Sequence, residues 1–198
     1  MINENIIKQI KDYADINNVP IMLDDGMDFL LDYIKKNNVK RILEIGAAIG
    51  YSAIMMCTAD PNITVTTIER DEKRYLEAVK NIKRVGLQDR ITLIYQDAFD
   101  VDLEEEYDLI FIDAAKAQSR KFFEKFEKNL VRGGTIITDN MNFHGLVGQQ
   151  LENIESRNIR QLVRKIKEYI FFLQDNPRYE TKFLDIGDGI AVSKHIYE

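Results

Sequence analysis

The stretch RILEIGAAIGYSAIMMC, residues 41–57, predicts a strand, a glycine-containing turn and a helix in immediate succession. The apolar run 41–45 has the continuity of a strand that is covered on both faces. Gly46 and Gly50 let the backbone turn sharply and approach a ligand closely. The run that follows, 50–60, is interpreted as a helix. A strand that leads through a tight turn into a helix is the repeating unit of a parallel α/β sheet.

The same alternation continues along the chain. Further strands are predicted at 64–69, 91–95, 107–113 and 134–139, and helices at 70–86 and 117–131. Gly86 stands where helices are often closed at their C-terminus. The pair Gly133-Gly134 is interpreted as a tight turn before the fifth strand. Crossover connections between parallel strands are right-handed, so these units predict a doubly wound sheet.

Both ends of the chain add elements to this sheet. A long helix is predicted at about 155–174, followed by two strand-like runs that flank Gly187-Asp188-Gly189, a hairpin signal. The predicted fold class is therefore α/β, with a mostly parallel sheet and a C-terminal antiparallel hairpin. We expect one domain over residues 1–198, with N-terminal helices in 1–37 and the core in 38–198. One face of the first helix is apolar and carries Ile6, Ile7, Ile10, Tyr13 and Ala14.

Composition restricts the class of protein. The chain has 198 residues, of which 45% are hydrophobic and 30% charged, and this is typical of a globular domain with a full core. Cys57 is the single cysteine, so it is expected to be a core residue in a reducing compartment. We see neither a signal peptide nor an apolar run of the ~18 residues that a membrane span needs, and expect a cytoplasmic protein with no membrane partner. The N-terminal helix and the aromatic run 169–174 offer apolar contact surface for a homodimer, although core packing is the ordinary interpretation of both.

Charge gives a mixed indication about nucleic acid. The net charge of −6 argues against such a partner, but seven of the acids lie in the segment 97–108, which has no base. In the predicted long helix, four basic residues recur at i, i+3, i+7 and i+10 and form one stripe. They are Arg157, Arg160, Arg164 and Lys167. A basic stripe beside a cleft would meet phosphates, although a solvated helix face is favoured on the stripe alone.

Ligands of open parallel sheets bind beyond the carboxyl ends of the strands. The first such end carries Gly46 and Gly50 but lacks the G-x-G-x-x-G spacing, which disfavours a dinucleotide site and leaves a simple turn as the alternative. Glu69 ends the second strand, where a carboxylate suits the two ribose hydroxyls of an adenosine or the N-terminus of the next helix. Asp97-Ala98 follows the third strand and either caps a helix or borders an adenine.

The ends of the fourth and fifth strands carry Asp113, Asp139 and Asn140. Two carboxylates that lie close together repel each other unless a cation lies between them. Three oxygen ligands suit a hard divalent ion, and Mg²⁺ is the natural choice. A strand-end turn would explain Asp139-Asn140 alone, but not the acid on the neighbouring strand. Lys116 follows Asp113 closely, and taken alone it is interpreted as a solvated lysine at the start of a helix.

Taken in order, LEIGAAIGYSA, IER, FIDAAK, TDN and GDG resemble the cation-dependent class I O-methyltransferases, which include catechol and caffeoyl-CoA methyltransferases. The resemblance runs from about residue 21 to residue 195. It implies a seven-stranded Rossmann-like sheet, S-adenosylmethionine at the carboxyl edge, and a divalent metal ion that positions the acceptor hydroxyl.

The resemblance also implies roles for individual residues. Lys116 and Asp113 would be catalytic, with Lys116 matching the lysine that helps to deprotonate the acceptor. The metal ligands would be Asp113, Asp139 and Asn140. Residues around the cofactor would be Met22, Glu44, Gly46, Gly50, Ser52, Glu69, Asp97, Ala98 and Asp113. Catechol-type enzymes carry larger side chains where this sequence has Ala114-Ala115, so a different acceptor pocket is expected.

Within the family, the sequence is most similar to the bacterial branch that methylates 5-hydroxyuridine at the wobble position of tRNA. The similarity lies in GAAIGYSAI, FIDAAKAQ and the C-terminal RNIRQLVRKIKEY…FLDIGDGIAVS. It implies the tRNA anticodon loop as partner and 5-methoxyuridine as product. Three alternatives remain open: a small-molecule methyltransferase acting on catechols, a nucleotide-binding fold with other chemistry, and a non-enzymatic interaction module.

Overall fold

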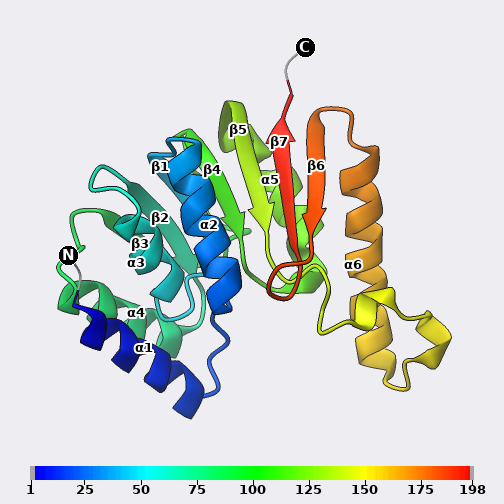
Figure 1. The fold of residues 1–198 in the computed structure, drawn as a ribbon, viewed down its shortest axis with the longest axis horizontal. Coiled ribbons are helices and arrows are strands. Elements are labelled where there is room, and N and C mark those ends of the chain that lie inside the picture. The colour runs from blue at the N-terminus through cyan, green and yellow to red at the C-terminus, as the bar shows by residue number, and fades with distance from the viewer. Residues whose placement is uncertain (1–2, 197–198) are drawn as a thin grey trace.

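A seven-stranded sheet forms the centre of the computed structural model, which describes residues 3–196 (Figure 1). The strand order is β3-β2-β1-β4-β5-β7-β6, with β7 antiparallel to both β5 and β6. The other neighbours are parallel, so the predicted fold class is confirmed. The strands are β1 (Arg41–Ile45), β2 (Thr64–Glu69), β3 (Ile91–Tyr95), β4 (Tyr107–Ile112), β5 (Leu130–Thr138), β6 (Tyr179–Leu184) and β7 (Ile190–His195).

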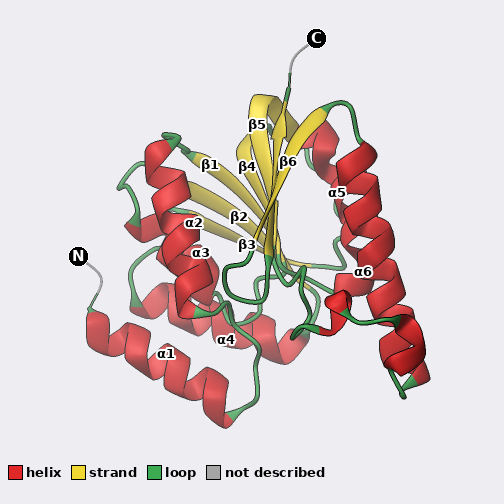
Figure 2. Cartoon of the chain, turned by 45° about the vertical axis from the view of Figure 1, so that its right-hand side comes forward, coloured by secondary structure: helices red, strands yellow, loops and turns green. Residues whose placement is uncertain are grey.

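Helices cover both faces of the sheet (Figure 2). One face carries α2 (Asp24–Lys36), α3 (Tyr51–Thr58) and α4 (Glu72–Arg84), with α1 (Glu4–Ile16) packed outside α3. The other face carries α5 (Ser119–Phe126) and α6 (Arg157–Asp175). Single 3-10 turns are formed by Lys116–Gln118, Glu127–Asn129, Leu146–Gly148 and Leu151–Asn153. The strand order reverses between β1 and β4, which is where ligands bind in folds of this type.

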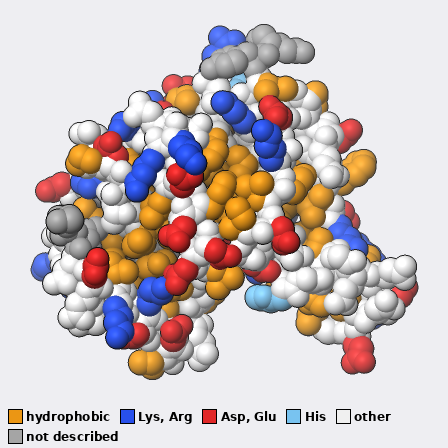
Figure 3. Space-filling view, viewed as in Figure 1, with side chains coloured by type: hydrophobic (Ala, Val, Ile, Leu, Met, Phe, Trp, Pro, Cys, Tyr) orange, Lys and Arg blue, Asp and Glu red, His pale blue; other side chains and the backbone are white. Residues whose placement is uncertain are grey.

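The N-terminal helices belong to the same core as the sheet. Ile10 and Ala14 of α1 are buried, and so are Met27 and Leu30 of α2, in one cluster with β1 and β4 side chains. Cys57 is buried in this cluster, and burial raises the pKa of its thiol to about 11. None of the helices in residues 3–196 is both long and apolar enough to cross a bilayer. On the face drawn in Figure 3, acidic and basic side chains surround an apolar area.

Two predicted boundaries are wrong. β5 begins at Leu130, so the glycine pair lies inside the strand and does not form a turn before it. Gly133 has φ +72°, and the β4–β5 register shifts between Tyr107 and Leu109, so the strand bulges here.

The helix predicted at 117–131 is also shorter, because α5 ends at Phe126. Asn129 is buried after α5, and its side-chain amide donates to the carbonyls of Leu103 and Glu105 at 2.8 and 3.0 Å. These bonds tie residue 129 to the loop between β3 and β4, and the chain enters β5 at the next residue.

Candidate functional site

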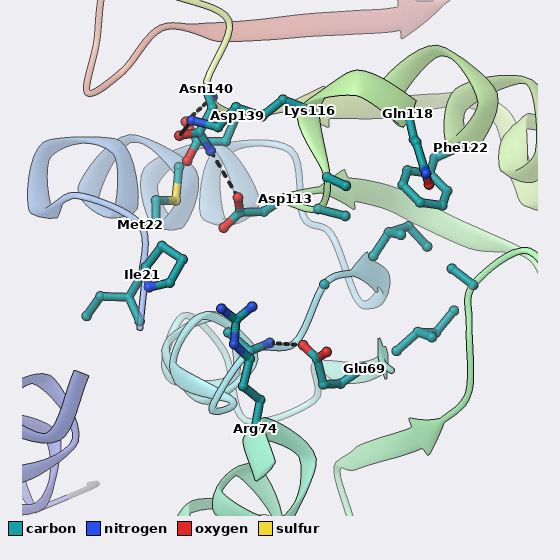
Figure 4. Close-up of a pocket in the computed structure, with 18 of the residues that line it drawn as sticks. Ile21, Met22, Glu69, Arg74, Asp113, Lys116, Gln118, Phe122, Asp139 and Asn140 are labelled. Atoms are coloured by element: carbon teal, nitrogen blue, oxygen red, sulfur yellow. Dashed lines mark hydrogen bonds between the residues drawn. The ribbon is translucent and has the colours of Figure 1, made fainter. Parts of the chain in front are cut away.

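A cavity of about 370 Å³ opens at the carboxyl ends of β1, β2, β3, β4 and β5 (Figure 4). Its lining brings together most of the residues predicted at those strand ends. The predicted residues that line it are Met22, Gly46, Glu69, Asp97, Ala98, Asp113, Lys116, Asp139 and Asn140. Segments far apart in the sequence therefore converge on one concave site.

Gly46 is required where the β1–α3 loop crosses the end of β4. Its φ is +104°, and a Cβ built there would lie 2.2 Å from the carbonyl oxygen of Asp113. Gly50 has φ +79° and forms the N-cap of α3, close to Ala78 of α4. The two glycines thus let this loop lie flat against its neighbours and leave its backbone facing the cavity.

Glu44 lies beneath this loop and does not line the cavity. It is fully buried, and its carboxylate accepts hydrogen bonds from the Ser52 hydroxyl and, at 2.5 Å, from the Thr67 hydroxyl. Burial raises the pKa of Glu44 to about 7, against the opposing effect of both hydroxyls. Glu44, Gly50 and Ser52 were predicted around the cofactor; none of them lines the cavity, and their role at the cofactor stays a prediction.

Glu69, at the end of β2, contacts the β1–α3 loop from the side opposite Glu44. Its Oε2 accepts the Ala48 N–H at 2.8 Å, and its Oε1 accepts the N–H groups of Arg70 and Asp71 at 2.9 and 2.8 Å. Asp71, and not Glu69, caps α4 by accepting the Arg74 N–H. Three backbone N–H groups therefore fix the Glu69 carboxylate at the cavity wall.

An apolar floor lies next to Glu69. Ala98 and Phe122 line the cavity there, and the Phe122 ring stacks on Phe99 with centroids 4.7 Å apart. Asp97 accepts the Phe99 N–H at 2.9 Å and pairs with Arg70 at 3.0 Å, and these contacts lower the pKa of its carboxyl. This combination of an apolar surface with a fixed polar rim suits a flat heterocycle such as adenine.

Asp113, Asp139 and Asn140 meet where β4 and β5 end. The Asn140 side-chain amide donates to Asp113 Oδ1 at 3.0 Å, and the Asn140 N–H donates to Asp139 Oδ1 at 2.7 Å. Asn140 itself has φ +65°, a left-handed conformation that asparagine tolerates. Burial raises the pKa of Asp113 and of Asp139, and for Asp139 the neighbouring Asp113 charge adds to the effect.

These residues fit a hard divalent cation by the chemistry of their donors. The two carboxylates repel each other, and a cation between them would remove that cost. Residues 3–196 contain no cluster of three or more His, Cys, Asp and Glu side chains placed to hold a metal. The Asn140 amide, which contacts Asp113, is the third candidate ligand. In this structure its nitrogen faces Asp113, and its oxygen would have to turn toward the carboxylates.

Lys116 projects into the same corner from the turn after β4. Its Nζ donates to Asn140 Oδ1 at 2.8 Å, lies 3.5 Å from Asp188 Oδ2, and sits 4.7 Å from the centre of the Phe143 ring. Asp188 and Phe143 were not among the predicted site residues. The GDG motif predicts only a hairpin turn at Asp188, because no local pattern indicates that residues 140–144 pack against this turn.

The predicted basic stripe lies on α6, which packs against the turn that carries Lys116. Figure 1 shows α6 beside β6, with its N-terminal end on the side of the sheet toward which β4 and β5 run. Arg157 and Arg164 are exposed, while Arg160 is half-buried. Lys167 is half-buried and donates to the Gln149 carbonyl at 2.7 Å.

The sequence profile of the O-methyltransferase family matches residues 2–196. The chain belongs to this family. A flavonoid 3',5'-methyltransferase from Vitis vinifera is 30% identical over 93% of this chain and 81% of its own length. A caffeoyl-CoA O-methyltransferase from Populus kitakamiensis is 29% identical over 94% of this chain and 82% of its own length. The predicted family and the predicted enzyme class, an O-methyltransferase, are confirmed.

Solved structures place this O-methyltransferase in the same fold. A Staphylococcus aureus protein provisionally described as a caffeoyl-CoA O-methyltransferase is 41% identical, with a TM-score of 0.91 over 96% of this chain and 92% of that one. A Bacillus cereus O-methyltransferase in complex with S-adenosylhomocysteine is 25% identical, with a TM-score of 0.85 over 98% of this chain and 92% of that one.

Proposed function

We propose that this O-methyltransferase transfers a methyl group from S-adenosylmethionine to a hydroxyl held by a divalent cation, Mg²⁺ by preference. The observation that carries the proposal is one cavity lined by the Glu69 carboxylate on one side, where we propose that it binds the ribose hydroxyls, and by the carboxylates of Asp113 and Asp139 on the other. The Bacillus cereus relative with bound S-adenosylhomocysteine supports the cofactor.

The chemistry follows from what each group can supply. Bound between Asp113, Asp139 and Asn140, the cation would lower the pKa of the acceptor hydroxyl and orient its oxygen. Lys116 accepts the hydroxyl proton or stabilises the oxyanion as an ammonium. The cofactor walls, built by Gly46 and Glu69, fix the sulfonium methyl, so that bringing the two reactants together provides much of the remaining rate enhancement.

For the acceptor we propose 5-hydroxyuridine at the wobble position of tRNA, with 5-methoxyuridine as the product. The sequence similarity to that branch of the family supports it. So does α6, which carries the basic stripe and packs against the turn that carries Lys116. Ala114 and Ala115, which line the cavity between Asp113 and Lys116, leave space beside the acceptor position.

A small-molecule acceptor with vicinal oxygens is the second candidate. The curated relatives favour it, since the proteins from Vitis vinifera and Populus kitakamiensis are named for flavonoid and caffeoyl-CoA substrates. The two acceptors share the cation and cofactor sites and differ in their need for the basic stripe.

Asp139→Ala tests the cation site. We expect methyl transfer to fall roughly a thousand-fold, because the acceptor loses its orientation and its lowered pKa. S-adenosylhomocysteine affinity, measured by calorimetry, should stay within about twofold. If the wild-type enzyme still transfers the methyl group in the presence of EDTA, the proposed requirement for a cation is wrong.

The acceptor is tested by incubating the enzyme with Mg²⁺, labelled S-adenosylmethionine and bulk tRNA that carries 5-hydroxyuridine, with a simple catechol in parallel. Nucleoside mass spectrometry should detect 5-methoxyuridine. Methylation of the catechol alone would retain the cation and cofactor sites and overturn the tRNA assignment.

A further inference from the structure

Asp188 lies at the tip of the β6–β7 hairpin, with only 8% of its surface exposed. Its Oδ1 accepts the His144 N–H at 2.5 Å, and its backbone carbonyl accepts the Asn142 N–H at 2.7 Å. Its Oδ2 has no hydrogen-bond partner within residues 3–196, although Lys116 Nζ lies 3.5 Å away. A buried carboxylate oxygen that points at an ammonium without a closed hydrogen bond is costly and needs an explanation.

The ammonium is held elsewhere in this structure. Lys116 donates to Asn140 Oδ1 at 2.8 Å, while the Asn140 amide nitrogen donates to Asp113 at 3.0 Å (Figure 4). A cation between the carboxylates needs the amide oxygen on the side where the nitrogen now lies. Turning the amide would bring its NH₂ group to face the Lys116 ammonium, and two donors cannot bond to each other.

We propose that Asp188 is a positioning residue. When Asn140 turns its side-chain oxygen toward a divalent cation, Asp188 Oδ2 replaces that oxygen as the hydrogen-bond acceptor of the Lys116 ammonium. The inference rests on the cation of the proposed function. Asp188 Oδ2 accepts no hydrogen bond but already forms an ion pair with Lys116 Nζ at 3.5 Å, and less than an ångström of movement by Nζ would close the hydrogen bond. The centre of the Phe143 ring lies 4.7 Å from Nζ, and this cation–π contact favours a short movement over a long one.

The surrounding loop is arranged so that Asp188 stays in place. Phe143, His144 and Gly145 all have positive φ, and the two bonds that Asp188 accepts from Asn142 and His144 hold this strained run. Gly189 approaches the same loop so closely that a Cβ there would lie 2.8 Å from the Asn142 nitrogen. The acceptor for Lys116 is therefore fixed by the hairpin before any cation binds.

Without the Asp188 charge, Lys116 would remain on Asn140 and compete with the cation for the amide. We would titrate Mn²⁺, which takes the same oxygen ligands as Mg²⁺, into the enzyme with S-adenosylhomocysteine and follow free Mn²⁺ by electron paramagnetic resonance. The proteins are wild type, Asp188→Asn, Lys116→Met and the double variant. Asn at 188 keeps an oxygen for the His144 N–H, and S-adenosylhomocysteine affinity and melting temperature check the fold.

We expect Asp188→Asn to weaken Mn²⁺ binding about 10-fold in the wild-type background and about 2-fold in the Lys116→Met background. The smaller loss is the direct effect of removing a nearby negative charge. Equal losses in both backgrounds, or no loss in either, would overturn the role of Asp188 while leaving the cation in place. If the wild type does not bind Mn²⁺, both the proposed cation site and this inference are wrong. If Asp188→Asn does not fold, Asp188→Ser offers the same neutral state for the same comparison.

Discussion

Glu44 illustrates how a single buried residue supports the site without touching the cavity. It stands opposite Thr67 in the β1–β2 register, and that hydroxyl and the Ser52 hydroxyl are its two hydrogen-bond donors. No cationic side chain is paired with it among the described contacts, so burial dominates and raises the pKa of the carboxyl to about 7. The loop that holds Gly46 thus rests on a group that changes charge near neutral pH.

Glu44→Gln should flatten the pH dependence of stability. Between the ordinary pKa of 4.5 and the folded value of about 7, the folded state holds a proton that the unfolded state releases, so the wild type loses stability as pH rises through this window. The variant lacks this contribution, which amounts to roughly 3 kcal/mol in the free energy of unfolding. Urea unfolding at pH 5 and pH 7.5 measures it, and parallel pH profiles for the two proteins would contradict the prediction.

Gly46 and Gly86 form a matched pair for testing the close approach of the β1–α3 loop. Both have positive φ, but only at Gly46 would a Cβ meet backbone, 2.2 Å from the Asp113 carbonyl oxygen; nothing lies within 4 Å at Gly86. Gly86→Ala should therefore cost about 1 kcal/mol of unfolding free energy through strain alone. Gly46→Ala should cost roughly 3 kcal/mol or more and weaken S-adenosylhomocysteine binding. Equal costs in urea unfolding would show that the clash is relieved by backbone movement.

At the scale of the elements, the sequence was most informative where patterns are local. Every predicted strand is present, because continuous apolar runs and the Gly187-Asp188-Gly189 turn are short-range signals. The predicted beginning of β5 and end of α5 were wrong, because both depend on distant contacts: Leu130 pairs with Tyr107 of β4, and Asn129 bonds to the loop between β3 and β4. A glycine pair predicts a turn on local grounds, and only pairing with β4 makes it a bulge.

The same reasoning explains which site residues could be predicted. Asp113, Asp139 and Asn140 follow from their place at strand ends, because parallel strands end at one edge of the sheet. Asp188 could not be predicted, since its environment is made by the distant residues Lys116 and His144. The hydrogen bond between Thr67 and Glu44 was not predicted either, because it depends on the alignment of β1 with β2.

α6 is the element that distinguishes the two proposed acceptors. Charge reversal at Arg160 and Arg164 should reduce kcat/KM for tRNA at least about 10-fold, because phosphates would then face carboxylates. Methylation of a catechol should change less than about twofold. Lys35→Glu with Lys83→Glu makes the same charge change at the ends of α2 and α4, away from the cavity lining, and serves as the control. Equal losses for both acceptors would contradict a role of α6 in RNA binding.

The whole molecule is acidic, so any tRNA contact has to be local. The net charge is −6, and the acids of 97–108 border the β3 side of the sheet, whereas α6 lies near its β6 end. This separation lets a basic surface coexist with overall repulsion of RNA. The homodimer remains a prediction, which light scattering would test.

Salt dependence tests this whole-molecule view of the acceptor. With at most four cations on the α6 stripe, tRNA affinity should fall with a logarithmic slope of about −3, or roughly 50-fold between 50 and 200 mM salt. Catechol methylation at fixed Mg²⁺ should be nearly constant over the same range, because the cavity carboxylates are largely enclosed and are screened little. Fluorescence anisotropy of a labelled anticodon stem-loop measures the slope, with the Arg160→Glu/Arg164→Glu variant expected to lose most of it. A steeper slope that this variant leaves unchanged would assign the phosphate contacts to another surface, and a flat one would favour the small-molecule acceptor.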